Sequence, residues 1–345
     1  MDTSRMAHGI EDVAREAGVS TATVSRALRG MPNVSEATRA RVEVAARRLG
    51  YRASPSAAAL ATGRTRTIGL LTPWINRWYF SNVIEGAERR LRAAGYDALL
   101  YSFAVSEQGR TPRVDPEVLR RRVDGILVVG LPLEPSEVEA LEALGVPIVF
   151  VGTGRGDHPV VGIDDVGLAR AATHYLIGLG HRRIGHITGT PDDLRSWTPP
   201  VDRRLGWASA LRDVGIEVEP TWEEFGFFDI EGGTASTHRL LDRHPELTAI
   251  FVASDEMAMG ALLAARERGL RVPEDVSIVG VDGHDISELV GLTTMAQPVE
   301  AQGAAAAGIM LGLIGAEPRR VEDVQGAAAF PTTLVVRRTT AAPRA

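Results

Sequence analysis

The sequence predicts a small all-helical N-terminal domain followed by an α/β core of two subdomains, each built on a parallel sheet. Three observations support this prediction. The chain has 345 residues, and at roughly 150 residues per domain this length allows two to three domains. Residues 10–50 carry apolar side chains at helical spacing. From residue 67 onward, short apolar runs alternate with helical stretches, which is typical of parallel sheets flanked by helices.

The overall composition is that of a soluble globular protein. Hydrophobic residues make up 44% and charged residues 24% of the chain, which excludes a mainly disordered or collagen-like chain. Cysteine is absent, so we expect no disulfide framework, thiolate metal site or cysteine nucleophile. The chain starts without an apolar signal peptide, and its longest uncharged run, which contains residues 304–315, is too short to span a bilayer. We therefore expect a cytoplasmic protein without a membrane partner.

Charge is distributed unevenly between the two predicted parts. The first 66 residues contain eleven arginines against six acidic residues, whereas the rest of the chain carries 27 arginines and 38 acidic residues. A small basic head on an acidic body indicates that a polyanion binds the head. A solvated charged surface would explain the charge alone equally well. The pattern of residues beneath the charge therefore has to decide between the two interpretations.

The first fifty residues predict three helices, the first two joined by a tight turn. Ala14 is followed four residues later by Gly18, and Val24 comes six residues after that. The small alanine lets the second helix cross closely, the glycine tolerates the turn, and the valine fills the crossing point. A third helix is predicted between the N-cap Ser35 and Gly50. Because the second helix is also basic, we interpret this unit as a helix-turn-helix rather than a generic helical hairpin.

A helix-turn-helix presents the N-terminal part of its second helix to base edges in the DNA major groove. This helix is predicted to begin at Thr21, with Ala22 and Arg26 on its outward side. Thr and Ala side chains can contact a thymine methyl group, and Arg can bond to guanine. Thr23 and Ser25 can hold phosphates, which position a protein without reading the base sequence.

Residues 54–66 predict a linker that contains one short helix. Ser54 suits the N-cap, Pro55 the first turn and Gly63 the end of this helix. A short isolated helix is unstable in water, so we expect it to form only when another element packs on it. A plain interdomain tether is the alternative.

The body contains seven apolar runs that suit strands buried on both faces. They are residues 68–72, 98–101, 125–130, 148–152, 184–188, 249–253 and 277–281. Their span of about 215 residues suits two sheets better than one, and we expect one more strand in the gap that holds residues 206–211 and 225–228. In such sheets ligands bind beyond the carboxyl ends of the strands. The candidates that follow the runs are Thr72, Pro73, Thr153, Asp164, Asp165, Ser254, Asp255 and Asp282.

Long motifs in both parts of the chain resemble the lactose-repressor/galactose-repressor (LacI/GalR) family of bacterial transcription regulators. In the head they are IEDVAREAGVSTATVSRAL (residues 10–28), NVSEATR (33–39) and LGYR (49–52). In the body they are TIGL (67–70), RVDGIL (122–127), LGHRRI (179–184), SDEMAMGAL (254–262), VPEDVSIVGVD (272–282) and LTTMAQP (292–298). The resemblance implies a helix-turn-helix DNA-binding domain on a core like a periplasmic sugar-binding protein.

The resemblance also implies a domain organisation. The DNA-binding domain takes residues 1–53 and the hinge helix residues 54–66. The N-subdomain of the effector-binding core takes residues 67–165 and about 297–328, and the C-subdomain takes residues 166–296 and about 329–340.

DNA contacts in the family imply both base-reading and backbone-binding residues in this head. Two copies of the hinge helix meet in the DNA minor groove in the family, where a leucine at the position of Leu60 opens a base step. The DNA-contacting residues that the resemblance implies are Thr21, Ala22, Thr23, Ser25, Arg26, Asn33, Tyr51, Ala57 and Leu60.

For the cleft of the core, the resemblance implies an effector site. The residues that it implies are Tyr79, Phe80, Arg203, Phe228 and Asp282. Trp197 in the adjoining loop and Asp255 after a strand are added as further effector contacts. Aromatic faces beside Arg and Asp suit sugar hydroxyls, which we prefer over a nucleoside or nucleobase. Core packing is the alternative for the aromatics, and helix capping for Asp255. The sequence departs from the family near this site, because Arg77-Trp-Tyr-Phe stands where the family usually has Asn-Pro-Phe-Phe.

These observations predict a ligand-responsive transcription regulator, in particular a homodimeric repressor that binds a near-palindromic double-stranded DNA operator. A small-molecule effector in the cleft would change the DNA affinity, as an inducer or as a corepressor. We expect no cofactor. His181 and His186 have no third ligand nearby in the sequence, so we expect no metal. A sugar-binding protein with an incidental helical head and an enzyme on the same scaffold stay as alternatives, although no phosphate-loop, nucleophile-elbow or zinc-protease motif occurs.

Overall fold

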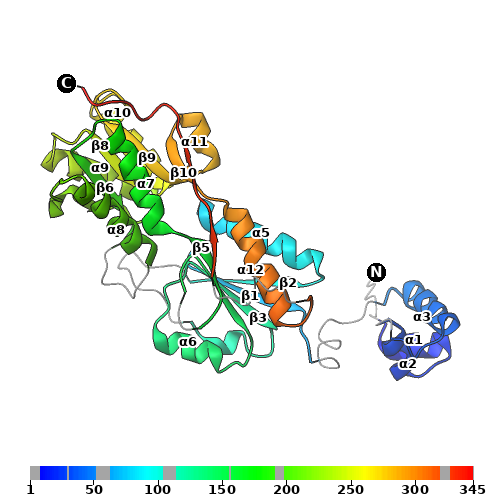
Figure 1. Ribbon diagram of the computed structural model, residues 1–345. Helices are drawn as coiled ribbons and strands as arrows, with labels where there is room; N and C mark the ends of the chain where they lie inside the picture. The colour runs from blue at the N-terminus through cyan, green and yellow to red at the C-terminus, as the bar shows by residue number, and fades with distance from the viewer. Residues whose placement is uncertain are drawn as a thin grey trace. The chain divides into compact units, whose positions relative to one another are not determined.

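The computed structural model describes residues 8–28, 31–51, 63–103, 114–154, 157–190, 198–318 and 327–344. The chain divides into two compact units, Met1–Thr65 and Arg66–Ala345 (Figure 1). Each unit has its own core, so we describe each by itself.

The smaller unit is the predicted three-helix head. Its helices are α1 (Ile10–Ala17), α2 (Thr21–Leu28) and α3 (Glu36–Arg48). Gly18 ends α1 in the left-handed conformation, with φ 63°. Ser20 Oγ accepts a hydrogen bond from Thr23 N at 3.2 Å, and Ser35 Oγ accepts one from Thr38 N at 3.3 Å. The turn glycine and the N-cap Ser35 are therefore confirmed, and Ser20 caps α2 in the same way.

The core of the head consists of small and β-branched side chains where the three helices meet. Val13, Val24 and Val42, one from each helix, are fully buried. Burying such a side chain contributes about 1.5–3 kcal/mol, so these three valines are a large share of the stability of so small a unit. The prediction that Val24 fills the helix crossing is confirmed.

The larger unit contains two α/β lobes, each with a six-stranded sheet (Figure 1). The N-terminal lobe has the strand order β11-β5-β4-β3-β1-β2, and all its pairings are parallel. Its strands are β1 (Thr67–Thr72), β2 (Asp97–Ser102), β3 (Gly125–Val129), β4 (Ile148–Val151), β5 (Val160–Ile163) and β11 (Ala327–Phe330). Its helices are α5 (Trp78–Ala93), α6 (Pro135–Glu142), α12 (Val299–Leu313) and the 3-10 helix η1 (Pro116–Val118).

The C-terminal lobe has the strand order β12-β10-β9-β8-β6-β7. Its strands are β6 (Ile184–Thr188), β7 (Glu223–Phe225), β8 (Ala249–Val252), β9 (Ser277–Asp282), β10 (Thr293–Ala296) and β12 (Thr333–Val335). Only β12 is antiparallel to its neighbour. Its helices are α7 (Asp165–Gly178), α8 (Thr198–Asp213), α9 (Ile230–Arg243), α10 (Asp255–Glu267), α11 (Asp285–Val290) and the 3-10 helix η2 (Pro220–Trp222). The predicted fold class is confirmed.

Within the described residues, the chain passes between the two lobes three times. It passes from β5 to α7, from β10 to α12 and from β11 to β12. Each sheet therefore contains strands from distant parts of the sequence. The lobes are joined by three short connections rather than by one tether.

Glycines allow α5 and α12 of the N-terminal lobe to pack side by side (Figure 1). A Cβ atom on Gly303 would lie 2.0 Å from the carbonyl oxygen of Val83, and one on Gly86 would lie 2.1 Å from that of Glu300. Both contacts are far below van der Waals separation. Only glycine fits at these two positions.

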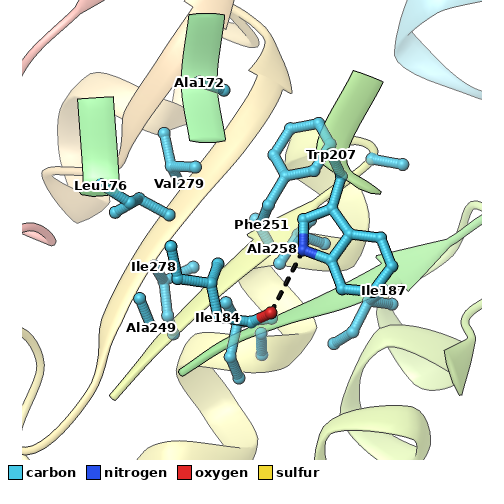
Figure 2. Close-up of a cluster of buried hydrophobic side chains, with 14 of the residues drawn as sticks. Ala172, Leu176, Ile184, Ile187, Trp207, Ala249, Phe251, Ala258, Ile278 and Val279 are labelled. Atoms are coloured by element: carbon cyan, nitrogen blue, oxygen red, sulfur yellow. Dashed lines mark hydrogen bonds between the residues drawn. The ribbon is translucent and has the colours of Figure 1, made fainter. Parts of the chain in front are cut away.

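The core of the C-terminal lobe forms around Trp207, which lies on α8 (Figure 2). Its indole nitrogen donates a hydrogen bond to the Ile184 carbonyl oxygen at 3.1 Å. His186 stacks on the rings of both Trp207 and Phe251, with centroid separations of 5.3 and 5.0 Å. Burial lowers the pKa of His186 to about 3, so the imidazole is neutral and acts as a core side chain.

Within the described part of the chain, no helix combines the length and the apolar character needed to cross a membrane.

Candidate functional site

The head presents its predicted base-reading residues on the exposed side of α2. Thr21, Ala22 and Arg26 are exposed, whereas Val24 and Ala27 of the same helix are buried. The helix therefore has one face for the core and one face for a partner. This division is the arrangement that a recognition helix needs to enter a major groove.

The residues predicted near the DNA backbone have varied surroundings. Thr23 is partly buried, and its hydroxyl shares a 2.9 Å hydrogen bond with the hydroxyl of Ser20. Ser25 is also partly buried, and Asn33 is exposed. Tyr51 packs against the core of the head. Ala57 and Leu60 lie outside the described residues.

In the larger unit, a pocket of about 60 Å³ lies between the two lobes. Five of the seven predicted effector residues line it: Tyr79, Phe80, Arg203, Phe228 and Asp282. The other lining residues are Arg77, Trp78, Gly130, Ile163, Asp165, Pro199, Ser254, Glu256 and Gln297. Trp197 lies outside the described residues.

The pocket lies at the carboxyl ends of the strands in both sheets. Gly130 follows β3, Asp165 follows β5, Ser254 follows β8, and Asp282 is the last residue of β9. At the carboxyl ends of parallel strands the chain leaves the sheet and exposes the residues of the turns, which is why ligands of open α/β sheets bind at this edge. The two lobes bring two such edges to one cavity.

Arg203, on α8, anchors the polar side of the pocket. Its Nε atom donates a hydrogen bond to Asp165 Oδ1 at 2.7 Å, and Nη1 donates one to the Ala253 carbonyl oxygen at 2.5 Å. Both charged side chains are buried. Burial raises the pKa of Asp165, and the positive charge of Arg203 acts in the opposite direction. A buried charge requires such a partner, so the pair fixes the guanidinium in place.

Asp282 supplies a second polar group to the pocket. Its Oδ1 atom accepts a hydrogen bond from Gln297 Nε2 at 2.7 Å, and its backbone has φ 122°, a region that disfavours residues with a Cβ. Burial raises the pKa of Asp282 to about 8, although Arg203 opposes this shift. The carboxyl group is therefore largely protonated at neutral pH. A protonated carboxyl can both donate and accept a hydrogen bond, as a hydroxyl ligand requires.

Aromatic rings form the apolar walls of the pocket. Tyr79 and Phe80 pack edge to face at 5.2 Å. The Phe228 ring covers Gly189, where a Cβ atom would lie 1.7 Å from the ring. Burial raises the pKa of the Tyr79 hydroxyl, so it remains a neutral donor. Flat apolar faces beside fixed polar groups are typical of small-molecule sites.

Asp255, which was predicted to contact the effector, does not line the pocket. Its buried carboxylate accepts hydrogen bonds from Gly283 N (3.0 Å), His284 N (2.8 Å) and the hydroxyls of Ser287 and Thr294 (2.8 and 2.7 Å). These bonds use both carboxylate oxygens. The Asp255 side chain therefore stabilises the turn after β9, which directly follows Asp282, without lining the pocket itself.

Several lining residues were not predicted as effector contacts. Asp165 and Ser254 were candidates because each follows a strand, and Gln297 lies in the LTTMAQP motif. Glu256 lies in the SDEMAMGAL motif and Pro199 shortly precedes Arg203, but the sequence alone does not show that α10 and α8 start at the pocket. Arg77 and Trp78 appeared only as departures from the family pattern.

No group of three or more histidine, aspartate or glutamate side chains within the described ranges is arranged to hold a metal ion. His181 instead contacts the hydroxyls of Thr248 and Ser277 and the Ala341 carbonyl oxygen.

Comparison with known proteins identifies the family. Residues 9–54 match the family described as bacterial regulatory proteins, lacI family, and residues 173–340 match the periplasmic binding protein-like domain. The HTH-type transcriptional repressor CytR of Escherichia coli (strain K12) is 39% identical over 295 residues, which cover 84% of this chain and 84% of CytR. The chain belongs to the LacI family.

Solved structures agree with this assignment to the LacI family. The transcriptional regulator CelR in complex with cellobiose is 32% identical, with a TM-score of 0.69 over 96% of this chain and 99% of CelR. The lac repressor dimer bound to operator and the anti-inducer ONPF is 28% identical, with a TM-score of 0.83 over 97% of this chain and 99% of that one. Membership of the LacI family makes this protein a transcription regulator with a helix-turn-helix head, not an enzyme.

Proposed function

We propose that this LacI-family protein is a ligand-responsive repressor that binds a near-palindromic operator as a homodimer. The observation that carries the proposal is the pocket between the lobes, where Arg203, Asp282 and aromatic rings converge in a chain that also has a helix-turn-helix head. An effector bound there changes the DNA affinity only by binding one state of the protein more tightly than the other. The effector acts by changing the angle between the lobes, and thereby the separation of the two linkers in the dimer.

The proposed domains are the DNA-binding residues 1–53, the hinge at 54–66, and the two halves of the core with the bounds predicted from the sequence. In the head, Thr21, Ala22 and Arg26 read bases. Backbone contacts come from Thr23, Ser25, Asn33 and Tyr51, and the hinge residue Ala57 also contacts the DNA. Leu60 enters a minor-groove step and bends the DNA.

A sugar is the effector class that the pocket suits best. Its walls are aromatic, and its polar groups are a fixed guanidinium, a neutral carboxyl of Asp282 and the amide of Gln297. Such groups pair with an array of hydroxyls, and the aromatic faces pack on the apolar side of a sugar ring. The cellobiose complex of CelR supports this choice. A nucleoside is the second candidate, because its base would stack on Phe228.

The surface of α11 supports a dimer. Ile286, Leu289 and Val290 are 46%, 79% and 39% exposed on this short helix. Their spacing of three and four residues places these side chains on one face of the helix, which suits a protein interface, and the lac repressor of similar fold is a dimer in its structure. A Leu289→Asp variant should sediment as a monomer if this helix contributes to the dimer. A variant that stays dimeric would place the interface elsewhere.

The central test uses the full chain. Duplexes with random sequence are incubated with the protein, and the bound fraction is sequenced, with and without a panel of sugars and nucleosides. We expect one enriched near-palindrome and at least one compound that changes its affinity. No enriched sequence under any of these conditions would contradict the proposal.

Two variants test the proposed roles of Asp282 in effector binding and of Leu60 in DNA bending. Asp282→Ala should lose the rise in melting temperature that an effector causes and keep operator binding. Leu60→Ala should bend the operator less, measured by the mobility of circularly permuted fragments. A retained effector response or an unchanged bend angle would remove the respective role.

A further inference from the structure

An arginine side chain of the N-terminal lobe binds a loop of the C-terminal lobe at the pocket. Arg77 is the N-cap of α5. Its Nη1 atom donates hydrogen bonds to the carbonyl oxygens of Phe227, at 3.4 Å, and of Phe228. Its Nη2 atom lies 3.3 Å from Asp229 Oδ2. Three consecutive residues of the other lobe are thus bound by one guanidinium.

The loop that Arg77 binds has an unfavourable backbone conformation. Phe227 and Phe228 have φ values of 52° and 59°. Two successive residues with a Cβ rarely adopt the left-handed region, so such a loop needs contacts that hold it. Inside its own lobe, Phe227 N donates to the Gly189 carbonyl oxygen at 2.8 Å, and Phe228 N to Met257 Sδ at 3.3 Å. Arg77 adds bonds to the carbonyl side of the same two residues.

Arg77 is itself held by its own lobe. Its guanidinium carbon lies 4.6 Å from the centre of the Trp74 ring, and Trp74 packs edge to face on Phe80 at 5.5 Å. The Arg77 side chain is 18% exposed. The guanidinium is therefore fixed against an aromatic face, so little conformational freedom is lost when it binds the loop.

Trp78 forms a second bridge between the lobes. Its indole nitrogen donates to Asp285 Oδ2 at 3.2 Å, and its ring stacks on His284 at 5.1 Å. Its backbone N–H donates to Glu256 Oε1 at 3.3 Å. The dipeptide that departs from the family pattern thus bonds the start of α5 to the C-terminal lobe.

We propose that Arg77 is a positioning residue that couples closure of the two lobes to the place of the Phe228 ring. When the lobes meet, Arg77 holds the Phe227–Phe228 carbonyls and Phe228 forms a pocket wall. When the lobes separate, these bonds break and the ring loses its fixed position. The role of Phe228 as a wall of the effector pocket rests on the proposed function, whereas the coupling between the lobes does not.

The first test measures the environment of the Phe228 ring in a variant of Arg77, which lies on the other lobe. The full chain is labelled with 4-fluorophenylalanine, which gives one ¹⁹F signal for each of the eight phenylalanines, and Phe228→Leu assigns the signal of interest. In Arg77→Met we expect this signal to shift by more than its linewidth or to split. The control is Arg89→Met on the same helix, because Arg89 pairs with Glu85 and Glu300 inside its own lobe. A Phe228 signal unchanged in Arg77→Met would overturn the proposal.

The reciprocal test reads Trp78 in a variant of Asp229. Asp229→Asn keeps an acceptor for the Gly232 N–H that caps α9 but removes the charge that faces Arg77. With 5-fluorotryptophan, we expect the Trp78 signal to move and the signal of the buried Trp207 to stay. The control is Asp242→Asn, because Asp242 on α9 pairs with Arg268 of the same lobe. A stationary Trp78 signal in Asp229→Asn would overturn the coupling between the lobes.

The two tests use different variants, so if one variant fails to fold, the other still decides whether the proposal holds. Both are measured without DNA and without an effector. Failure of the proposed regulator function would therefore leave these results standing, and failure of the coupling would leave operator binding untouched.

Discussion

The Nε atom of Arg203 donates a hydrogen bond to Asp165 Oδ1 across 2.7 Å, and both side chains are buried between the lobes. Removing one partner leaves the other charge buried without a partner, which costs about 3–5 kcal/mol of stability. We therefore expect Arg203→Met to lower the free energy of unfolding by this amount, measured by urea titration with tryptophan fluorescence. The double variant with Asp165→Leu should recover most of the loss.

The matched control for this pair is Arg170→Met. Arg170 pairs with Asp213 on the surface of the same lobe, at 2.9 Å. Exposed pairs contribute less than about 1 kcal/mol, so this variant should unfold nearly like the parent protein. Equal losses for the two arginine variants would contradict the argument from burial.

Asp282 should make stability depend on pH in an unusual direction. Burial raises its pKa from 3.8 to about 8, so the folded state keeps a proton that the unfolded chain releases. The stabilisation from this proton is fully present below about pH 4 and is lost as the pH rises through about 8, by up to about 1.4 kcal/mol per pH unit. Asp282→Asn removes this contribution. The stability of the variant relative to the parent should therefore rise between pH 5 and about 8, and parallel curves in urea titrations would refute the shift.

The crossing of α5 and α12 predicts opposite effects for two alanine substitutions on one helix. In Gly303→Ala the new methyl group would lie 2.0 Å from the Val83 carbonyl oxygen, and such overpacking costs about 1–3 kcal/mol or more. In Gly308→Ala no heavy atom lies within 4 Å of the new methyl, so the higher helix propensity of alanine should stabilise the protein by about 0.5–1 kcal/mol. Thermal unfolding of both variants tests the pair, and a stable Gly303→Ala would rule out the close crossing.

Arg26 is exposed on α2 and is the strongest candidate for base recognition. Arg26→Ala should weaken binding to the selected operator by about 1–3 kcal/mol and relax the preference at one base pair. Fluorescence anisotropy with operator and with random DNA at fixed salt measures both effects. The control is Arg92→Ala on α5, because Arg92 pairs with Glu88 in the core unit. An equal loss on random DNA would make Arg26 a phosphate contact.

The head and the buried strands could be predicted from the sequence because their residues carry local signals. Gly18, Ser20 and Ser35 have roles that depend only on neighbours a few residues away. The seven apolar runs correspond to seven strands. Six of them are buried on both faces, as a continuous apolar run predicts, whereas β2 is an edge strand whose residues are exposed or half-buried, so the prediction of two-sided burial was wrong there. β5, β10, β11 and β12 were not predicted, because strands of three or four residues are too short to be recognised as apolar runs.

The pocket was predicted only in part, because it depends on how distant segments meet. Arg203 and Asp282 were identified through the resemblance, and both line the cavity. Glu256 and Gln297 were not, since nothing near them in the sequence shows that the start of α10 and the end of β10 reach the same cavity. Asp255 lies one residue before Glu256, yet its side chain turns to the β9 loop instead.

The strands β11 and β12 follow one another in the chain but complete the edges of different sheets. A protein truncated before residue 327 would lose an outer strand from both lobes at once, and the backbone of β5 and β10 would be left open to pair with other molecules. We expect such shortened chains to aggregate on expression, whereas deletion of the head should leave an intact receptor core. Designs that divide the two lobes therefore have to supply each of them with its own piece of the C-terminal segment.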